Sequence, residues 1–465
     1  MMKIEKSLAD YLVNVRYDEI PRPVIEATKA QIINILSAAI GGSEAGGIGE
    51  LVDLLQGWGG KPESTLIAYG YKLPAPAAAQ ANASMAHALD FDDTYNKMTL
   101  HVAVVTVPPC LAVAELLGGV SGKEFLTAVT LAVDLGCRMT AVLQTPPGEP
   151  QTAWHFWHFT TLFGYFMAAA AAGRLLRLDV EQMLNALGLA YHQASGNMQV
   201  IREGALAKRL GPGFASRRGV ESALMAQKGI TGVKNFIEGE VGFYDLYHPR
   251  STYRNLGKLT DRLGEKFENE DVSLKPYPCG VVNHTAIEAA MALATEYDIQ
   301  PVDVTKIMVY TGAGSYILCQ PLEEKRHPKN AVDTQFSIPW SVATAIAKRR
   351  ASIEDYTDQA TKDAIVNSLT SKLDVGLDPS LTGETIEPAR VSITLGDGRT
   401  LTKQVDIPLG SPKKPFSAVD VKRKLETCNS VSIKPFSEQQ LDRLISTAGS
   451  LQEFEDVTAL VSLLT

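Results

Sequence analysis

Cysteine is scarce in this chain of 465 residues, which has five cysteines and no C-x-x-C pair. A zinc knuckle or an iron–sulfur cluster needs closely spaced cysteines, so neither is predicted, and an aconitase-like iron–sulfur mechanism is disfavoured. An odd number of scattered cysteines is typical of a reducing compartment rather than of a disulfide framework.

Excess positive charge and long apolar runs are also lacking. The net charge of −8 argues against a nucleic-acid or anionic-membrane partner. The most apolar stretch, Val102 to Val120, contains Pro108-Pro109 and Glu115, which predicts two buried elements rather than a membrane span. The N-terminal residues show no apolar segment typical of a signal peptide. We therefore expect a cytoplasmic protein, in the cytosol or in an organelle matrix.

Phosphate-binding and repeat motifs are absent from the sequence as well. No G-x-x-x-x-G-K-[ST] motif occurs, and no G-x-G-x-x-G follows a predicted strand. No short repeat period indicates a solenoid. The composition is otherwise that of an ordinary globular protein, with 45% hydrophobic and 21% charged residues. A nucleotide cofactor is not expected.

Helical periodicity dominates the first 265 residues. Glu26 to Ile40 has apolar residues at helical spacing and is followed by Gly41-Gly42, a typical helix end. Ala75 to Leu89 and Phe163 to Leu178 are apolar around most of their circumference, which predicts buried helices. Asp179 is expected to cap the next helix.

The pattern changes after about residue 265. Val304 to Thr311 and Val391 to Leu395 alternate as strands do, and a turn at 396–398 precedes a strand over Thr400 to Val405. Helices are predicted at 285–297, 418–427 and 437–448. The predicted fold is mainly α: a large helical domain formed by residues 1–265 and 410–465, with a smaller α/β (α+β) lid domain inserted at 266–409.

Acidic residues cluster at the end of one predicted helix. If that helix continues through 87–94, then His87, Asp90 and Thr94 share one face. Carboxylates at a helix C-terminus oppose the helix dipole, so their presence suggests a compensating use. A solvated loop is the alternative. Asp92-Asp93 also superficially resembles the aspartate-rich metal motif of terpene synthases, but the sequence shows no second such motif downstream.

Two histidines near this cluster are candidate acid/base groups. Asp90 is close enough in sequence to orient His101, and such a pair can set a general base near neutral pH. His158 lies in the aromatic segment 154–161, where an apolar pocket would shift its pKa toward the neutral form. His155, in the same segment, is expected to be an ordinary core residue.

Basic residues offer a site for an anion. Lys208 and Arg209 precede the glycine-rich segment 211–213, and a helix is expected to run on to Lys228. A solvated basic helix start is the alternative. His284 is expected at the start of the later helix, where its side chain can face an anion. A base, an orienting carboxylate and cations form the set that proton abstraction next to a carboxylate requires.

Six segments stand out along the chain: HALDFDDT at 87–94, WHFTTLFG at 157–164, AKRLGPG at 207–213, GITG at 229–232, KPYPC at 275–279 and QFSIPWSVA at 335–343. In matching order, these segments resemble the MmgE/PrpD family, which includes 2-methylcitrate dehydratase, cis-aconitate decarboxylase and iminodisuccinate epimerase. The resemblance implies metal-free and cofactor-free chemistry on a small di- or tricarboxylate. It also implies a homodimer whose subunits each have a helical domain, a lid domain and a cleft between them.

The resemblance also assigns site residues. It implies that His101 and His158 are the acid/base pair, that Asp90 orients them, and that the substrate is bound by a further set of side chains. That set comprises Thr94, Lys208, His284 and the lid tyrosine Tyr316, whereas Arg209 is expected to bind the substrate from the local charge pattern alone.

The sequence departs from the family pattern at two positions near the expected pocket. His101 is followed by Val102-Ala103 where the family commonly has proline, and Gly211 stands where a histidine is expected. These changes bear on the substrate more than on the class of reaction. The first expectation is a carbon–oxygen lyase similar to 2-methylcitrate dehydratase. A decarboxylase, an epimerase and, least favoured, a non-catalytic carboxylate-binding protein stay open.

Overall fold

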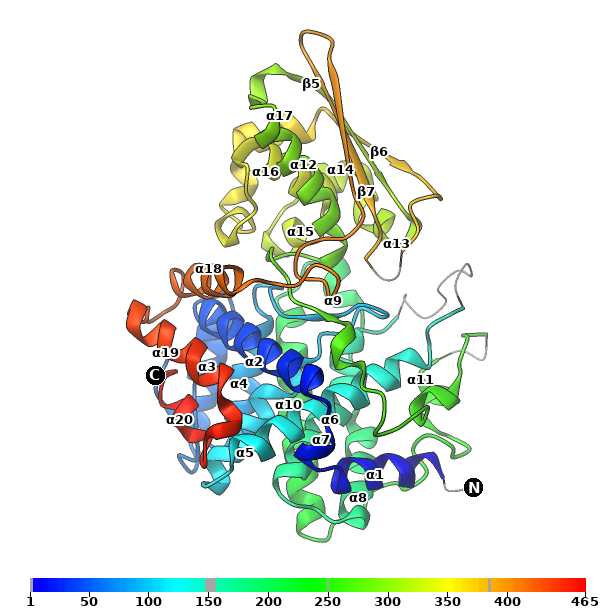
Figure 1. The fold of residues 1–465 in the computed structure, drawn as a ribbon, viewed down its shortest axis with the longest axis vertical. Helices are drawn as coiled ribbons and strands as arrows, with labels where there is room; N and C mark the ends of the chain where they lie inside the picture. Colours follow the sequence, from blue (N-terminus) through cyan, green and yellow to red (C-terminus); the bar gives the residue numbers. More distant parts are fainter. Residues whose placement is uncertain (1–2, 147–155, 249–250, 384–385) are drawn as a thin grey trace.

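The computed structural model describes residues 3–146, 156–248, 251–383 and 386–465. The chain forms two bodies, a larger helical one that holds both termini and a smaller one that combines helices with a sheet (Figure 1). The fold is mainly α with a small α/β part, as predicted. Among the described residues, no helix has the length and apolar character needed to cross a bilayer.

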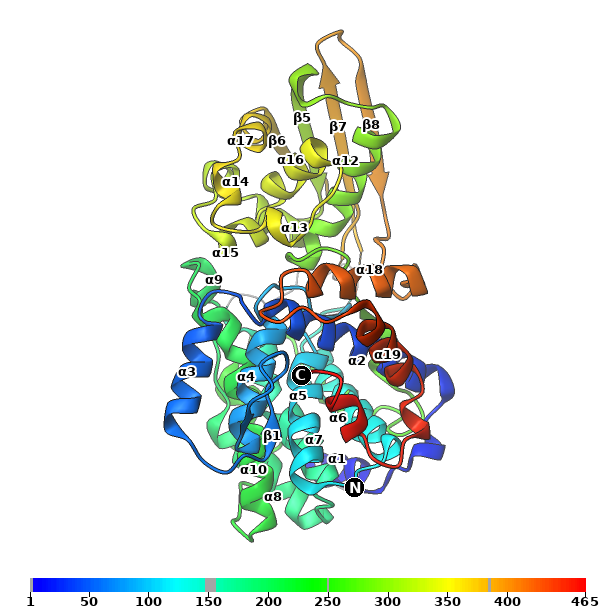
Figure 2. The same ribbon diagram turned by 90° about the vertical axis from the view of Figure 1, so that its left-hand side faces the viewer.

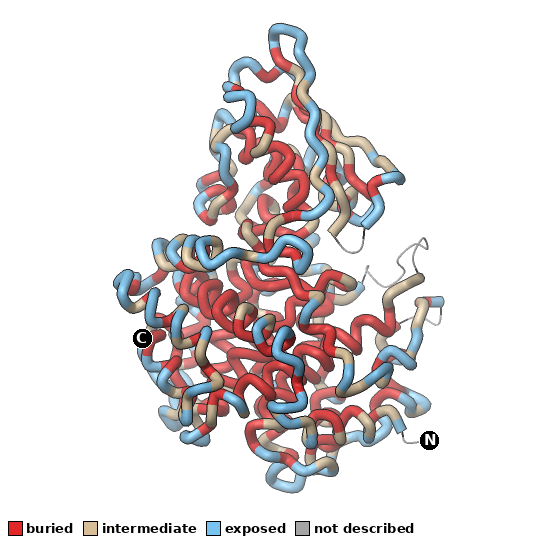
Figure 3. The backbone as a smooth tube through the Cα atoms, in the orientation of Figure 1, coloured by how far each residue is buried: buried red, intermediate tan, exposed pale blue. Residues whose placement is uncertain are grey.

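The larger body consists of helices from both ends of the chain. Most of the backbone here is buried (Figure 3). Its helices are α1 (Ile4–Asn14), α2 (Arg22–Gly42), α3 (Ile48–Trp58), α4 (Ala75–His87), α5 (Val107–Leu117), α6 (Gly122–Ala141), α7 (Phe159–Leu175), α8 (Val180–Gln193), α9 (Gln199–Arg202), α10 (Ala207–Gln227), α11 (Phe243–Tyr247), α18 (Ala418–Asn429), α19 (Glu438–Gly449) and α20 (Thr458–Val461). Two small antiparallel pairs join β1 (Ser64–Thr65) to β2 (Lys72–Leu73) and β3 (Thr94–Tyr95) to β4 (Val272–Ser273).

The smaller body has a four-stranded sheet in the order β6-β5-β7-β8. β5 pairs in parallel with β6, and the other two pairings are antiparallel. Buried and half-buried residues alternate along β7, as expected for a strand with one face on the core. The elements are α12 (His284–Glu296), β5 (Val304–Thr311), α13 (Ala313–Tyr316), α14 (Leu322–Arg326), α15 (Ala331–Gln335), α16 (Ile338–Lys348), α17 (Ala364–Thr370), β6 (Leu373–Leu377), β7 (Ala389–Leu395) and β8 (Thr400–Val405).

Each body has its own apolar core. One core draws on residues between 8 and 272 and between 425 and 464, and the other on residues between 277 and 395. Helix α18 lies across the top of the larger body and faces the smaller one in both views (Figures 1 and 2). The domain boundaries expected at residues 265/266 and 409/410 stay a prediction.

The two buried elements predicted between Val102 and Val120 are present, as the 3-10 turn Ala103–Val105 and helix α5. Pro108 and Pro109 lie in the first turn of α5, where the missing N–H groups have no intrahelical partner to lose, so the break falls at Thr106 instead. The glycine-rich segment 211–213 lies inside α10, which begins at Ala207, so Lys208 and Arg209 belong to the first turn of the helix itself.

Helix α10 passes close to two other helices, and this contact places Lys208. A Cβ atom on Gly213 would lie 2.1 Å from Ser84 Oγ of α4, and one on Gly219 would lie 2.3 Å from Ala168 Cβ of α7. Only glycine allows approaches this close. The small residues therefore hold the first turn of α10 beside the end of α4, where the acidic segment begins.

Candidate active site

A cavity of about 140 Å³ lies where the two bodies meet. Its polar side includes five of the predicted site residues, and its other side is apolar. The lining residues are Asp90, Thr94, Thr99, His101, Trp157, His158, Phe159, Met198, Ile201, Lys208, Lys275, Gly280, Val281, Val282, Gly314, Ile317, Leu318 and Phe336.

Asp90 forms the acidic corner of the cavity. Helix α4 ends at His87, so the expected common helical face through residue 94 does not form, and Asp90 instead adopts a left-handed conformation with φ of 52°. Its carboxylate forms ion pairs with Lys208 and Lys275, the latter at 2.8 Å. Burial would raise the pKa of Asp90, but the two ammonium groups hold it well below its usual range. Asp90 is therefore an anion shared by two cations.

His101 is oriented by its neighbours Asp92 and Asp93 rather than by Asp90, which corrects the predicted contact. Its Nδ1 lies 2.6 Å from the Asp93 carbonyl oxygen and 3.4 Å from both Asp92 Oδ1 and Thr94 Oγ1. A carbonyl can only accept, so Nδ1 carries the proton and Nε2 keeps its lone pair. The Asp93 carboxylate accepts from the Val102 and Ala103 N–H groups and fixes the loop. His101 is thus prepared to act as a base.

His158 lies across the same cavity at the start of α7. Its Nδ1 is 2.8 Å from Thr161 Oγ1, one turn into the helix. The preceding residue, Trp157, donates its indole N–H to the Tyr247 carbonyl at 2.5 Å, which anchors the segment. The His101 N–H also donates to Thr160 Oγ1 at 3.0 Å, so the two histidine segments are joined directly.

A third histidine, His87, lies behind this pair. Its ring centroid is 5.0 Å from that of His101 and 5.5 Å from that of His158, and its Nδ1 contacts Asp92 Oδ2 at 2.7 Å. Burial, together with the Lys208 ammonium, lowers the pKa of His87 well below its ordinary value. Burial, partly opposed at His101 by the Asp92 carboxylate, also lowers the pKa of His101 and of His158 well below the ordinary value. The histidines at the cavity are therefore neutral in the unliganded protein at pH 7.

Three predicted site residues lie outside the cavity lining. The Arg209 guanidinium donates to the Gly46 carbonyl at 2.8 Å and is absent from the cavity lining. Tyr316 is half-buried, and its hydroxyl accepts from the Gln320 amide at 3.0 Å. His284 is buried at the start of α12 against the Tyr277 ring. Any contact of these three with a substrate stays a prediction, and His155 lies outside the described residues.

Sequence reasoning missed several residues of the site. Lys275 was quoted within KPYPC but given no role, although it lines the cavity and binds Asp90. Asp92 and Asp93 are expected from the sequence in a solvated loop or a metal motif, not as the groups that orient His101. The ion pair between Lys275 and Asp90 joins residues 185 positions apart, a separation that no local pattern reveals.

Four buried side chains could in principle hold a metal ion. Ligand atoms of His87, Asp90, Asp92 and His101 lie within 4.8 Å of one another. However, both Asp90 oxygens already bind ammonium groups, and His87 Nδ1 is bound to Asp92. A divalent cation would have to displace two lysines and would meet their positive charge.

Chelator treatment tests this inference. We expect EDTA or phenanthroline to leave kcat/KM unchanged, because the lysines already supply the positive charge at this position. Progress curves are compared for untreated protein and for protein from which the chelator has been removed by gel filtration. A loss of activity that added Zn²⁺ or Mn²⁺ restores would contradict the expectation.

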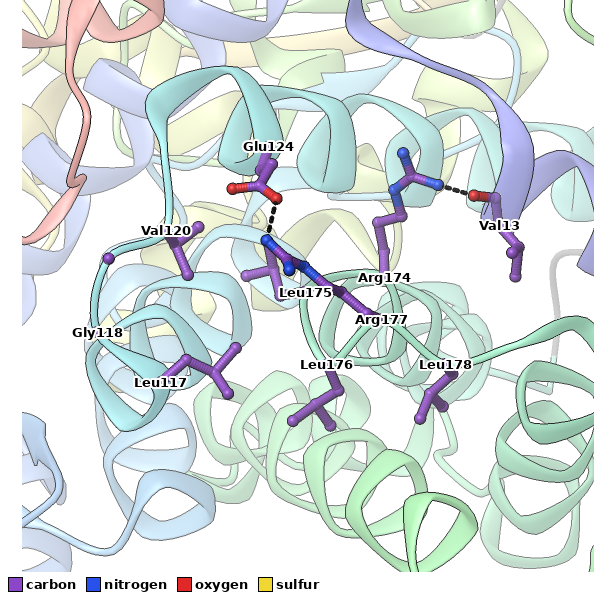
Figure 4. Close-up of a pocket in the computed structure, with 11 residues that line it drawn as sticks. Val13, Leu117, Gly118, Val120, Glu124, Arg174, Leu175, Leu176, Arg177 and Leu178 are labelled. Carbon is purple, nitrogen blue, oxygen red and sulfur yellow. Dashed lines mark hydrogen bonds and ion pairs between the residues drawn. The ribbon is translucent and has the colours of Figure 1, made fainter.

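A larger cavity, of about 530 Å³, lies on the larger body away from these residues (Figure 4). Its cations are already engaged, since Arg174 donates to the backbone carbonyls of Val13 and Val15, and Arg177 pairs with Glu124 at 2.8 Å. None of the residues described in its lining is a histidine or lysine. This cavity offers no acid/base group comparable to the histidines of the first.

His284 makes stability sensitive to acid. Burial, with a contribution from the Lys275 ammonium, lowers the pKa of His284 from 6.5 to about 3. A folded-state pKa below the unfolded value means that its stability contribution is complete above pH 6.5 and is lost as the pH falls toward 3. In this window the titration of His284 should lower the unfolding free energy by about 1.4 kcal/mol for each pH unit of acidification.

Urea unfolding at pH 6.5, 5.5 and 4.5 measures this effect. The His284→Gln variant should lose less unfolding free energy between these pH values than the wild type. The exposed His327→Gln variant is the control and should behave as the wild type does. If the unfolding free energy falls equally with pH in all three proteins, His284 does not titrate in this window.

Comparisons with known proteins agree with this architecture. The sequence matches the MmgE/PrpD N-terminal domain over residues 6–255 and the MmgE/PrpD C-terminal domain over residues 277–448. It is 24% identical to cis-aconitate decarboxylase of Aspergillus terreus, with 99% of this chain and 96% of the relative aligned. Identity is 26% both to human cis-aconitate decarboxylase, over 84% of this chain and 80% of the relative, and to 2-methylcitrate dehydratase of Cupriavidus necator, over 63% of each. The chain belongs to the MmgE/PrpD family.

Proposed function

We propose that the protein is a lyase that transfers a proton at a carbon next to a carboxylate of a small di- or tricarboxylic acid. The observation that carries the proposal is the pairing of two neutral histidines, His101 and His158, with the two ammonium groups of Lys208 and Lys275 around one cavity. Histidine supplies proton transfer near neutral pH, and buried ammonium groups suit an anionic substrate.

The charge balance of the corner favours an anionic ligand. Lys208 and Lys275 both contact one carboxylate, Asp90, while the other buried carboxylate nearby, Asp92, contacts His87 and His101. Two buried ammonium groups that share one carboxylate partner can bind a further carboxylate, so a substrate carboxylate is expected to bind at this corner. The Thr94 hydroxyl lines the same wall and can donate a further hydrogen bond.

Substrate binding also prepares the histidines for acid catalysis. In the free protein, positive charge on Lys208 and Lys275 contributes to the low pKa of His158. A bound carboxylate neutralises that charge, and a second or third carboxylate raises the pKa of a nearby histidine. One histidine can therefore take up a proton when the substrate is in place, while the other stays neutral.

Decarboxylation is the first candidate reaction. The C–C bond to the leaving carboxylate breaks, CO₂ departs, and the electron pair is delocalised toward a remaining carboxylate held by the lysines. A protonated histidine then delivers its proton to carbon. The apolar wall formed by Phe159, Ile201, Val281, Ile317 and Leu318 supports this choice, because an apolar setting favours loss of charge from the departing carboxylate. The end-to-end match to cis-aconitate decarboxylases is a second support.

Dehydration, which the sequence favoured, is the second candidate. One histidine removes the proton next to a carboxylate, the electron pair forms the C=C bond, and the second histidine protonates the departing hydroxyl so that water leaves. The support is the match to 2-methylcitrate dehydratase over 63% of the chain. Two histidines on one cavity suit this reaction, since it needs a base and an acid.

Product analysis separates the candidates. The chelator-treated protein is incubated with cis-aconitate and with 2-methylcitrate, and the products are identified by NMR together with any CO₂ released. CO₂ with a dicarboxylate product supports decarboxylation, and an unsaturated tricarboxylate from 2-methylcitrate supports dehydration. Inversion or exchange without elimination would point to an epimerase. Turnover of neither acid, nor of citrate or malate, would count against the proposed lyase.

A further inference from the structure

A buried lysine from the C-terminal part of the chain reaches the acidic corner from behind. Lys424 lies on α18 and is 5% exposed. Its Nζ donates to Asn34 Oδ1 at 2.6 Å, to the Phe91 carbonyl at 2.6 Å and to the Lys275 carbonyl at 2.8 Å. An ammonium group has three N–H donors, so these three acceptors use its full capacity.

Two of those acceptors belong to the segments that form the cavity corner. Phe91 directly follows Asp90, and Lys275 is the residue whose Nζ donates to Asp90 Oδ2 at 2.8 Å and to the Asp90 carbonyl at 2.9 Å. Lys424 thus holds the backbones of two segments whose side chains meet in front of it. The Phe91 ring, centred 3.9 Å from Lys424 Nζ, adds a cation–π contact.

The conformation of Asp90 requires such support. A residue with a side chain at φ of 52° is in a sparsely populated region, and it stays there only when surrounding contacts determine its position. Lys275 binds the corner from the cavity side, and Lys424 binds the next carbonyl from the opposite side. In both ribbon views α18 lies at the top of the larger body, on the side that faces the smaller one (Figures 1 and 2).

We propose that Lys424 is a positioning residue of the active site: it fixes the Asp90 corner relative to Lys275 without touching the substrate. It is absent from the cavity lining. The catalytic part of this inference rests on the proposed function, whereas the structural part, the geometry of the Asp90–Lys275 pair, does not.

The first test measures how readily Lys275, the partner of Asp90, is acylated. Lys275 is buried and bound to Asp90, so an acylating reagent should modify it slowly in the wild type, as mapped by mass spectrometry of its peptide. Lys424→Met removes all three donors, and acylation of Lys275 should then become several-fold faster. Lys424→Gln keeps two N–H donors and should give a smaller increase, which provides a second variant if Lys424→Met folds poorly.

Matched controls separate positioning from stability. Leu444→Ala, in the buried face of α19, should lower the melting temperature without altering the acylation of Lys275. Lys422→Met removes a half-buried lysine of the same helix that pairs with Glu438 and Asp442, and it should leave the acylation of Lys275 unchanged. If Lys275 reacts no faster in the Lys424 variants than in Leu444→Ala, the inference is overturned.

The second test is kinetic and uses well-folded protein far below its melting temperature. Lys424→Met should lower kcat/KM per folded molecule by about 10–10²-fold, because small misplacements of a binding group carry losses of this size. Leu444→Ala should leave it unchanged. If Lys275 is acylated faster in the Lys424 variants but no protein is active, the wild type included, the proposed function is wrong. The role of Lys424 in positioning Lys275 is then still supported. Unchanged kinetics and unchanged acylation would overturn the positioning role while leaving the lyase proposal intact.

Discussion

Replacement of His158 or His101 by asparagine should lower kcat by about 10²–10⁴-fold, the usual contribution of a positioned acid or base. Asparagine keeps a polar side chain of similar reach but cannot exchange a proton near pH 7. His101 has a lone pair on Nε2, because its Nδ1 proton is held by the Asp93 carbonyl at 2.6 Å. Steady-state kinetics with the substrate found by product analysis measure the effect.

The pH dependence of kcat/KM then assigns the two roles. Loss of the base removes the acidic limb of the profile, and loss of the acid removes the basic limb. The exposed His192→Asn variant, at the end of α8, is the matched control and should behave as the wild type does. Full activity in His101→Asn or His158→Asn would remove that histidine from the mechanism.

Substitution of Lys208 by methionine should lower kcat/KM by about 30-fold or more, since removal of one member of a buried charge pair costs about 2–5 kcal/mol. The main effect is expected in KM, because Lys208 is proposed to bind a carboxylate in the ground state as well as in the transition state. The Phe336 ring, centred 5.1 Å from Lys208 Nζ, can pack against the methionine side chain and preserve the fold.

A matched variant and a double variant sharpen this result. Lys228→Met removes an exposed lysine just after α10 and should have no effect. In Lys208→Met the Asp90 carboxylate keeps its ion pair with Lys275, and a double variant that adds Asp90→Asn should not restore substrate affinity. If Lys208→Met leaves both KM and kcat unchanged, the role of Lys208 in binding a carboxylate is wrong.

The regular helices and strands were predictable from local patterns. Apolar periodicity located α2, α4 and α7, although α7 begins at Phe159 rather than Phe163, and the Asp179 cap is confirmed by its bond from the Gln182 N–H at 2.8 Å. Alternation located β5 and β7. These elements bury one face or most of their surface, so their sequence carries the pattern directly.

The candidate site was only partly predictable because it is made of irregular segments. Asp90 lies in a left-handed turn that no periodicity indicates, and its partners Lys208 and Lys275 are 118 and 185 positions away. Lys424 lies 333 positions from its acceptor Phe91, and no sequence motif marks it as part of the site. A polar residue buried within an amphipathic helix is the only local hint that such a lysine could have offered.

Other expectations from the sequence concern properties that a single chain does not test. The homodimer implied by the family resemblance, the cytoplasmic location and the absence of a cofactor stay predictions. Arg209 is a clearer case, since its bond to the Gly46 carbonyl and its absence from the cavity lining favour a structural role.

Proton exchange with solvent tests the central claim most directly. The chelator-treated protein is incubated in D₂O with cis-aconitate, 2-methylcitrate, citrate and simple hydroxy- and amino-dicarboxylates, and proton NMR follows each carbon next to a carboxylate. We predict that deuterium enters one such position with the wild type and does not enter with the double variant His101→Asn/His158→Asn. No exchange in any compound, or exchange that persists without both histidines, would contradict the account.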